Sequence, residues 1–388
     1  MRLYYDGCFA KPITMKTTLV VFLCFASLLI KAQLPQQPQN IFIITTDGFR
    51  WQEVFNGADG NIVGNPKYVA DTALLKAIYW DDDTATRRNK LMPFFWNVIA
   101  KKGQLYGNRN YGNKMNVSNI YKFSYPGYNE IFTGYADLKF IPNKPVPNSN
   151  TNILEYLNAQ DAYKGKVVAF ASWNILPFIL NEERSRFEVN GGYEAVKGAD
   201  SDTVFHLINQ IEDGVAEKSA TRYDELTYLS AREYIKQQHP KVAFIGLGET
   251  DEFAHSNKYD QYLYAANKVD KMIAELWYMV QSDPFYKDNT TFIITTDHGR
   301  GSKANTWNQH NTFVKGSGEI WMALLGPGIV PMGEIKQQQK NFQKQIAATI
   351  AMLLGQTFAT DHSVAEAINL PVQANTEKEN AIVVNTRK

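Results

Sequence analysis

Cysteine is nearly absent from this chain, because its only two cysteines, Cys8 and Cys24, both precede residue 33. The sequence after that point offers no thiol for a disulfide framework, a thiolate zinc site or a cysteine nucleophile. An excess of one charge is lacking as well, since 40 Lys and Arg residues face 39 Asp and Glu residues, for a formal net charge of +1. This balance gives no reason to expect a nucleic-acid polymer or an anionic membrane as the main partner.

Apolar runs long enough to cross a bilayer are also lacking. The run at residues 19–30 is too short to span comfortably and has the proportions of a signal-peptide core, with Lys16 before it and Lys31-Ala32-Gln33 after it. We therefore expect residues 1–32 to be a secretory leader, for which Met15 is a second candidate start. Residues 33–388 are expected to form one exported domain without a stable membrane anchor, periplasmic if the source is a Gram-negative bacterium.

Short apolar runs and longer amphipathic segments alternate along the rest of the chain, which shows no internal repeat. The apolar runs have strand length and cover residues 40–46, 166–172, 242–247, 291–296 and 320–325. The segments with helical spacing cover residues 91–100, 153–157, 204–211, 223–235, 259–280 and 342–354. This alternation predicts an α/β fold, a three-layer α/β/α sandwich around a mainly parallel sheet. Two stretches rich in Gly, Pro, Asn and Asp are expected to be loops over the carboxyl edge of the sheet, residues 57–90 and 142–152.

Acidic residues and histidines follow several of the predicted strands. Asp47 closes the first strand, and Asp297-His298-Gly299 closes the strand at 291–296. Open α/β sheets bind their ligands at the carboxyl ends of the strands, where these side chains would lie. Asp251 and His255 follow the strand at 242–247 with i and i+4 spacing, so one helical turn would present both to a single ion.

Each of these fragments also has an ordinary structural explanation. An Asp at the end of a strand often caps the next helix, and a lone His before a loop is usually a surface residue. Ser124, which precedes Tyr125-Pro126 in a further fragment that we expect at a strand end, could be a plain turn residue. The conjunction favours a site, because three of the six histidines lie at such places: His255, His298 and His310.

The order of these motifs resembles that of the alkaline phosphatase superfamily, in particular its type I phosphodiesterase/nucleotide pyrophosphatase-like branch. That family has a strand ending in a metal-binding Asp, a Ser or Thr nucleophile before a Pro and a Thr-Gly, then Asp-x-x-x-His, Asp-His-Gly and a final His. The matching positions lie within residues 41–328 and are Asp47, Ser124 with Pro126 and Thr133-Gly134, Asp251 with His255, Asp297-His298-Gly299, and His310.

The resemblance implies a two-zinc phosphoric ester hydrolase that acts on a small-molecule phosphate ester through a phosphoserine on Ser124. Its expected ligands form two groups: Asp47, Asp297 and His298, with the Ser124 oxygen, for one zinc, and Asp251, His255 and His310 for the other. Three protein ligands of mixed Asp and His leave each zinc an open position, as catalytic sites require. Two ions about 3.5–4 Å apart can clamp the attacking and leaving oxygens of an in-line displacement.

The group that supports the phosphoryl oxygens is harder to choose. The diesterases of this family usually place an Asn near the nucleophile, and Asn148 is our candidate. The alternatives are Asn143 and Asn150 in the same loop, and Asn129, Lys122 and Arg300 outside it. Ser124 itself does not separate monoesterases from diesterases, because the diesterase branch commonly has Thr and the monoesterases have Ser at this position.

Other functions remain to be weighed against this one. A sulfatase of the same superfamily needs Cys or Ser followed by x-Pro-x-Arg, whereas Tyr128 stands at the Arg position here. A phosphoglycerate mutase-like member needs a second domain after the nucleophile, and residues 124–251 are too short and continuous for one. A non-catalytic exported binding protein would be expected to have lost ligands, yet every ligand position is filled. A purely structural metal site would not need a serine beside the metals.

Overall fold

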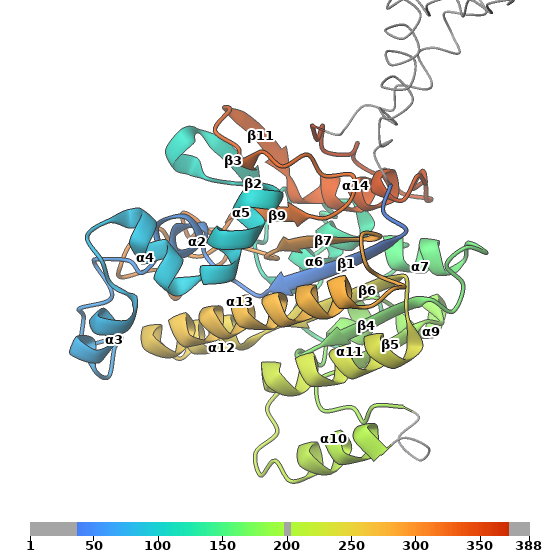
Figure 1. Cartoon of the computed structure of the whole chain (residues 1–388), viewed down its shortest axis with the longest axis horizontal. Helices are drawn as coiled ribbons and strands as arrows, with labels where there is room; N and C mark the ends of the chain where they lie inside the picture. The colour runs from blue at the N-terminus through green and yellow to red at the C-terminus, as the bar shows by residue number, and fades with distance from the viewer. Residues whose placement is uncertain (1–36, 198–202, 372–388) are drawn as a thin grey trace, which may run out of the picture. The chain divides into compact units, whose positions relative to one another are not determined.

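The computed structural model describes residues 37–197 and 203–371 (Figure 1). The leader expected at residues 1–32 lies outside this part of the chain, as does the carboxyl-terminal end of the expected domain. Among the helices that the structure describes, none has both the length and the apolar character of a membrane span.

An eight-stranded sheet forms the centre of the fold, in the order β10-β2-β9-β7-β1-β6-β4-β5. Neighbouring strands run parallel except where β9 lies between β7 and β2, so the expected mainly parallel sheet is confirmed. The strands are β1 (Asn40–Thr46), β2 (Gln104–Tyr106), β4 (Val167–Ala171), β5 (Glu188–Gly191), β6 (Val242–Leu247), β7 (Thr290–Thr295), β9 (Met322–Leu325) and β10 (Gly333–Glu334).

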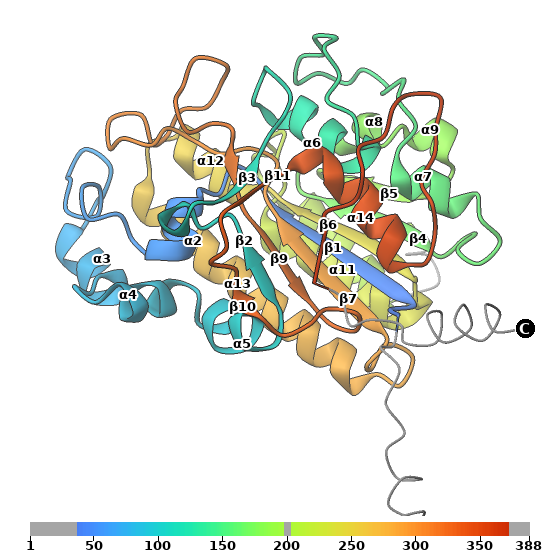
Figure 2. The ribbon, with the colours of Figure 1, turned by 90° about the horizontal axis from the view of Figure 1, so that it is seen from above.

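Helices cover both faces of this sheet, as the alternating side chains of β1 require. Phe42 and Ile44 pack into the core on one face, and Ile41 and Ile43 pack into the core on the other. The first face is covered by α2 (Trp51–Asn56), α11 (Asp224–Gln238), α12 (Glu249–His255) and α13 (Tyr259–Ser282). The second is covered by α6 (Ser124–Thr133), α7 (Ile153–Asn158), α8 (Leu176–Ile179) and α14 (Ile346–Leu353) (Figure 2). The predicted three-layer α/β/α sandwich is therefore confirmed.

A second, three-stranded sheet is absent from the sequence prediction. It has the order β11-β3-β8 and contains β3 (Asn113–Asn116), β8 (Glu319–Ile320) and β11 (Gln339–Phe342). The expected single strand at residues 320–325 is thus wrong, because Trp321 divides it between the two sheets. The Trp321 side chain is fully buried, and its Nε1 donates a hydrogen bond to the Phe49 carbonyl at 3.0 Å.

The stretch at residues 57–90 is not wholly irregular, contrary to expectation, because it contains α3 (Thr72–Tyr79) and α4 (Thr84–Leu91). Asp71 and Asp83, which count as loop residues in the sequence prediction, instead cap these helices by accepting from backbone N–H groups at 2.9 and 2.8 Å. The expected helix at 91–100 is also divided, because α4 ends at Leu91 and a π-helical turn follows at Phe95–Ile99, continued by α5 (Ala100–Lys102).

Candidate active site

Asp47 follows β1 directly, in a turn that only a glycine can complete. The next residue, Gly48, has φ +58°, and a Cβ on it would lie 2.7 Å from Asp251 Oδ1. The Gly48 N–H donates to Asp297 Oδ1 at 3.0 Å, which ties the end of β1 to the segment after β7. These contacts bring two acids from distant parts of the chain to one edge of the sheet.

Helix α12 positions Asp251 and His255 on one face, as their spacing predicts. Asp224 holds the start of this helix, because its carboxylate accepts from the N–H groups of Gly248 at 2.8 Å and Glu249 at 3.1 Å. Burial, together with the nearby Glu249 carboxylate, raises the pKa of Asp224 to about 7.

Ser124 is the first residue of α6 and does not close a strand, so its expected position at a strand end is wrong. It follows β3 after a loop that includes Lys122, whose φ is +56°. Helix α6 lies very close to the end of β7, because a Cβ on Gly127 would stand 2.5 Å from the Asp297 carbonyl oxygen. This close approach holds the buried Ser124 hydroxyl near the acids and histidines.

Asp47, Asp297 and His298 form the first group of candidate ligands. Their donor atoms all lie within 4.8 Å of one another, and all three residues are buried. His298 Nε2 is 3.4 Å from both Asp47 Oδ1 and Asp297 Oδ2. Ser124 Oγ is also 3.4 Å from His298 Nε2, so the serine hydroxyl stands at this group.

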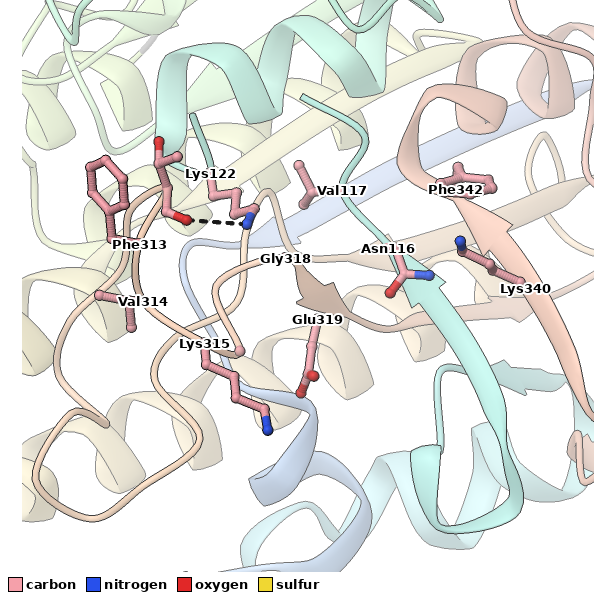
Figure 3. Close-up of a pocket in the computed structure, with 12 residues that line it drawn as sticks. Asn116, Val117, Lys122, Phe313, Val314, Lys315, Gly318, Glu319, Lys340 and Phe342 are labelled. Atoms are coloured by element: carbon pink, nitrogen blue, oxygen red, sulfur yellow. Dashed lines mark hydrogen bonds between the residues drawn. The ribbon is translucent and has the colours of Figure 1, made fainter. Parts of the chain in front are cut away.

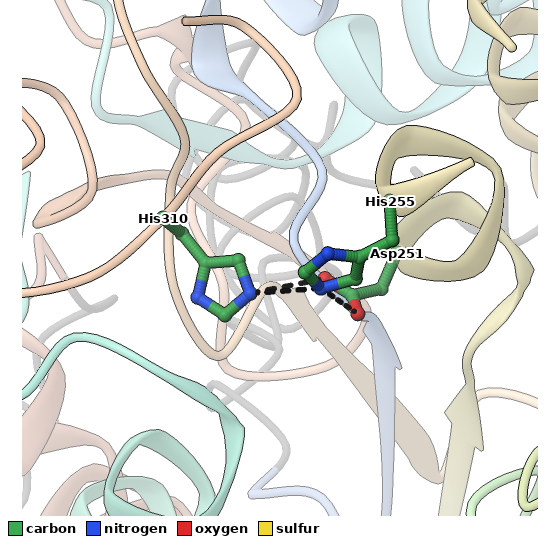
Figure 4. A group of neighbouring side chains, drawn as sticks. All are labelled: Asp251, His255 and His310. Carbon is green, nitrogen blue, oxygen red and sulfur yellow. Dashed lines mark hydrogen bonds and ion pairs between the residues drawn. The ribbon is translucent and has the colours of Figure 1, made fainter. Parts of the chain in front are cut away.

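Asp251, His255 and His310 form the second group, drawn in Figure 4. His255 Nε2 is 3.0 Å from Asp251 Oδ2 and 3.0 Å from His310 Nε2. The two groups are adjacent, because the rings of His298 and His310 stack with centroids 3.9 Å apart. The structure thus brings together all six Asp and His residues that the resemblance implies as ligands, from four separate segments of the chain.

The outer nitrogens of two histidines are held by backbone carbonyls. His298 Nδ1 lies 3.0 Å from the Gly299 oxygen, and His310 Nδ1 lies 3.2 Å from the Lys122 oxygen. A carbonyl accepts only from a protonated nitrogen, so in the neutral ring each Nε2 keeps a lone pair that faces its group. Metal-binding histidines are typically oriented in this way.

The electrostatics of the first group call for a cation. Burial raises the pKa of Asp47 well above its ordinary value, and the neighbouring Asp297 carboxylate raises it further, against the opposing effects of His298 and Arg300. Burial likewise raises the pKa of Asp297 to about 7. Asp47 Oδ1 and Asp297 Oδ2 are buried and have no hydrogen-bond partner among the described residues. Two such oxygens beside neutral imidazole nitrogens fit a divalent metal ion.

Comparisons with known proteins agree with this donor set. Residues 190–357 match the family model described as the metalloenzyme superfamily. The match covers fewer than half of the residues of the chain. A comparison with curated proteins gives no match.

Solved structures similar to this protein share its fold at low sequence identity. One is the lipoteichoic acid synthase LtaP from Listeria monocytogenes, with 12% identity, a TM-score of 0.54 and coverage of 88% of this chain and 77% of that chain. Another is the wild type alkaline phosphatase PafA, with 11% identity, a TM-score of 0.53 and coverage of 86% and 98%. A third is a 2-O GAG sulfatase, with 12% identity, a TM-score of 0.52 and coverage of 85% and 73%. The solved structures therefore confirm the fold that the resemblance implies, and the family match agrees with it, while the diesterase branch stays a prediction.

Arg300 is a central residue of the candidate site that the sequence suggests only as an alternative phosphoryl support. It is buried, and it forms an ion pair with Asp251 Oδ1. It also donates to the carbonyls of Gly48 at 3.1 Å and Asn308 at 2.7 Å. Arg300 therefore joins the turn after β1, helix α12 and the loop that carries His310. Its position directly after Asp-His-Gly is the only signal in the sequence.

The structure does not bring Asn148 to Ser124. Asn148 is fully buried, its Nδ2 donates to Asn129 Oδ1 at 3.0 Å, and its Oδ1 accepts from the Asn150 N–H at 3.0 Å. Asn143 is the asparagine next to the nucleophile, because its Oδ1 accepts from the Tyr125 N–H at 2.9 Å. Asn143 is exposed, and its Nδ2 has no hydrogen-bond partner among the described residues.

Two further side chains hold the backbone of the site and carry no signal in the sequence. Gln343 Nε2 donates to the carbonyls of Thr296 at 3.1 Å and Asp297 at 2.6 Å. Thr250 Oγ1 donates to the Asp47 carbonyl at 2.5 Å and lies 3.1 Å from Thr46 Oγ1. Gln343 and Thr250 hold the backbone just after β7 and β1, where candidate ligands lie. They therefore act on the site through the backbone.

Proposed function

We propose that this protein is a two-zinc phosphoric ester hydrolase in which Ser124 is the nucleophile. The observation that carries the proposal is the 3.4 Å separation between Ser124 Oγ and His298 Nε2, which sets a hydroxyl beside two adjacent groups of Asp and His donors. A structural metal site would have no use for a serine at this position. Members of the superfamily mostly act on phosphate and sulfate esters with the help of metal ions, which supports the same conclusion.

The two donor groups would each hold one zinc ion, with Asp47, Asp297 and His298 in one and Asp251, His255 and His310 in the other. When bound, divalent ions lower the pKa of a neighbouring hydroxyl and offset the negative charge on the oxygens around phosphorus. The side chain of His255 is 53% exposed, so the second group faces solvent and is open to a substrate. No part of this arrangement requires a histidine to act as a general base.

The residues of the chain would act on the ester in two displacements. The Ser124 oxygen attacks phosphorus while the bond to the leaving alcohol breaks, which forms a phosphoserine. Water then attacks this phosphoserine, which releases phosphate and restores the hydroxyl. The phosphoryl group would sit at the amino end of α6, where the helix dipole favours an anion, and the exposed amide of Asn143 could donate to one of its oxygens.

Phosphate esters are preferred over sulfate esters as the substrate class. The sulfatases of this superfamily need an Arg four residues after the nucleophile, and Tyr128 occupies that position here, fully buried among apolar residues. Similarity to a 2-O GAG sulfatase concerns the fold alone. Mono- and diesters both fit the geometry of the two groups.

The test is a rate comparison on aryl phosphate monoesters, aryl phosphate diesters and aryl sulfates, with zinc-loaded wild type and Ser124→Ala. We expect hydrolysis of at least one phosphate ester by the wild type. We expect a loss of roughly 10³-fold or more in Ser124→Ala, as for other nucleophile deletions, with zinc still bound. Equally slow hydrolysis of all three substrates by both proteins would refute the proposal.

We also propose that residues 1–32 are a cleaved leader and that the remainder is a single exported domain, periplasmic in a Gram-negative host. The support is the charge and apolar pattern of residues 16–33. Intact-mass analysis of protein from the periplasmic and cytoplasmic fractions tests this. A full-length mass confined to the cytoplasm would contradict it.

A further inference from the structure

We propose that a lysine-lined pocket, which includes Lys122 two residues before Ser124, is a subsite for a second anionic group on the substrate, such as a phosphate, sulfate or carboxylate. The inference rests on the proposed function, because it specifies a part of the ester that lies away from the reacting bond. The pocket has a volume of about 430 Å³ and lies between the small sheet and the loop at residues 312–318 (Figure 3).

The pocket is connected to the candidate active site through Lys122. The Lys122 carbonyl lies 3.2 Å from His310 Nδ1, and Lys122 stands two residues before Ser124. Its side chain enters the pocket, where Nζ donates to the Thr312 carbonyl at 3.4 Å (Figure 3). One residue therefore touches the second ligand group with its backbone and lines the pocket with its side chain.

The pocket has an excess of positive charge. Lys122, Lys315 and Lys340 line it, and within residues 37–197 and 203–371 none of the three is part of an ion pair. Glu319 is the one carboxylate of the lining, and its charge is already engaged, because it accepts from Trp51 Nε1 at 3.0 Å and lies 3.7 Å from Arg109 Nε. An anion that entered would meet three ammonium groups and a neutralised carboxylate.

The floor of the pocket adds a neutral donor. The Asn116 side chain lies at the end of β3, and its Oδ1 accepts from Arg109 Nη2. Its Nδ2 is buried and has no hydrogen-bond partner among the described residues. With the carbonyl taken and the amide nitrogen unpaired, Asn116 presents a donor, which matches an oxyanion and not a cation.

The geometry favours an anion on the substrate over one from another source. Lys122 links the pocket to the second ligand group through its carbonyl, so an ester with two anionic groups could place one at Ser124 and the other among the lysines. Lys315 and Lys340 are exposed, and Lys340 Nζ lies 5.0 Å from the centroid of the Phe342 ring. Exposed charges of this kind contribute modestly, about two- to fivefold in binding each, and salt weakens them.

The experiment compares glucose 1,6-bisphosphate with glucose 1-phosphate, two esters that differ by a second phosphate. The ratio of their kcat/KM values for release of the C1 phosphate is measured by ³¹P NMR. The proteins are the zinc-loaded wild type, the double variant Lys315→Gln/Lys340→Gln, and Lys164→Gln. Lys164 is an exposed lysine just before β4, at the opposite edge of the sheet, and serves as the matched control.

We expect the wild type and Lys164→Gln to prefer the bisphosphate equally. The double variant should lose this preference by about tenfold at low salt, and by less at high salt. An unchanged ratio in the double variant, with both esters still hydrolysed, would overturn the subsite and leave the proposed function intact.

A binding measurement tests the subsite separately from the proposed hydrolase function. Calorimetric titration of zinc-loaded Ser124→Ala should show tighter binding of the bisphosphate, and adding the two Gln substitutions should remove that advantage. If the wild type hydrolyses neither sugar phosphate, the comparison on aryl esters still decides the proposed function, and this titration decides the subsite. Equal binding of both sugar phosphates, or lysine-dependent binding of inorganic phosphate alone, would overturn the inference.

Discussion

Arg300 carries the sharpest prediction at the scale of single residues. Its guanidinium contacts three segments that bear ligands, so Arg300→Gln should loosen the group of Asp251, His255 and His310. Loss of such an orienting residue typically lowers metal affinity by roughly 10–100-fold. Arg300→Lys should not rescue it, because an ammonium group cannot bridge three acceptors in fixed directions. Competition with a fluorescent zinc chelator measures the affinity.

Arg222→Gln is the matched control for this substitution. Arg222 is also buried and pairs with Glu212 at 2.9 Å, but the structure gives it no contact with a ligand residue. Both Gln variants should be destabilised, and only the Arg300 variant should lose zinc affinity. Equal zinc affinities in the two variants would mean that Arg300 contributes only to packing.

The two asparagines of the loop at 142–152 should behave differently. Asn143→Ala should lower kcat/KM by roughly 10–100-fold, since it removes an exposed donor beside Ser124, and should lower the free energy of unfolding by about 1 kcal/mol, because the Tyr125 N–H loses its acceptor. Asn148→Ala should lower the free energy of unfolding by about 1–3 kcal/mol and leave kcat/KM nearly unchanged, because it removes a fully buried side chain that bonds both the Asn150 N–H and Asn129 Oδ1. Steady-state kinetics and urea unfolding distinguish them, and the reverse pattern would restore Asn148 as the catalytic candidate.

At the scale of elements, the packing of α6 on the end of β7 determines where Ser124 lies. Gly127→Ala would place a Cβ 2.5 Å from the Asp297 carbonyl, so the helix must shift. Overpacking of this kind costs about 1–3 kcal/mol, and a displaced nucleophile should lower activity by roughly 100-fold. Gly214→Ala is the control, since its nearest neighbour would be 3.4 Å away. Wild-type kcat/KM in Gly127→Ala would show that the close approach is dispensable.

The elements that the sequence predicts correctly are those with local signals. The apolar runs of β1, β4, β6 and β7 predict buried parallel strands, and a long apolar stripe predicts the helix α13. The strands that escape prediction are two to four residues long, and β11 contains Gln339, Lys340 and Asn341. Such strands exist because of partners far away in the sequence, which no local pattern encodes.

In the candidate site, too, residues with local sequence signals are predictable and those placed by distant contacts are not. Ligands at strand ends and on one turn of α12 are predictable, because sheet topology and helical spacing bring them together. The conformation of the loop at 142–152 is not predictable, because Arg184 of α9 (Glu182–Ser185) fixes it by donating to the carbonyls of Asn148, Ser149 and Asn150. The choice between Asn143 and Asn148 therefore depends on a contact that the sequence does not reveal.

At the scale of the whole molecule, metal removal should destabilise the protein. The buried carboxylates of Asp47 and Asp297 repel each other when no cation offsets them. A bound ion at a thousandfold excess over its Kd contributes about 4 kcal/mol. The melting temperature at pH 7.5 should therefore fall in EDTA and recover with stoichiometric zinc, as followed by calorimetry.

The double variant Asp47→Asn/Asp297→Asn tests the physical cause of this effect. It should melt above the EDTA-treated wild type, and EDTA should change its melting temperature much less. If elemental analysis finds no metal in the wild type and EDTA leaves its melting temperature unchanged, the metal assignment is wrong.

The central strand β1 is synthesised early, but the strands and the carboxylate that bond to it are synthesised late. Its hydrogen-bonded neighbours are β6 and β7. The Gly48 N–H that follows it donates to the Asp297 carboxylate, which lies 249 residues further along the chain. During synthesis, an apolar strand would thus emerge from the ribosome long before its partners, a state prone to aggregation. Neither ligand group is complete until the chain has passed residue 297, and the second requires His310. Metal loading at these groups would therefore follow the synthesis of most of the chain, and the metal supply of the place where folding ends would decide which ions are acquired.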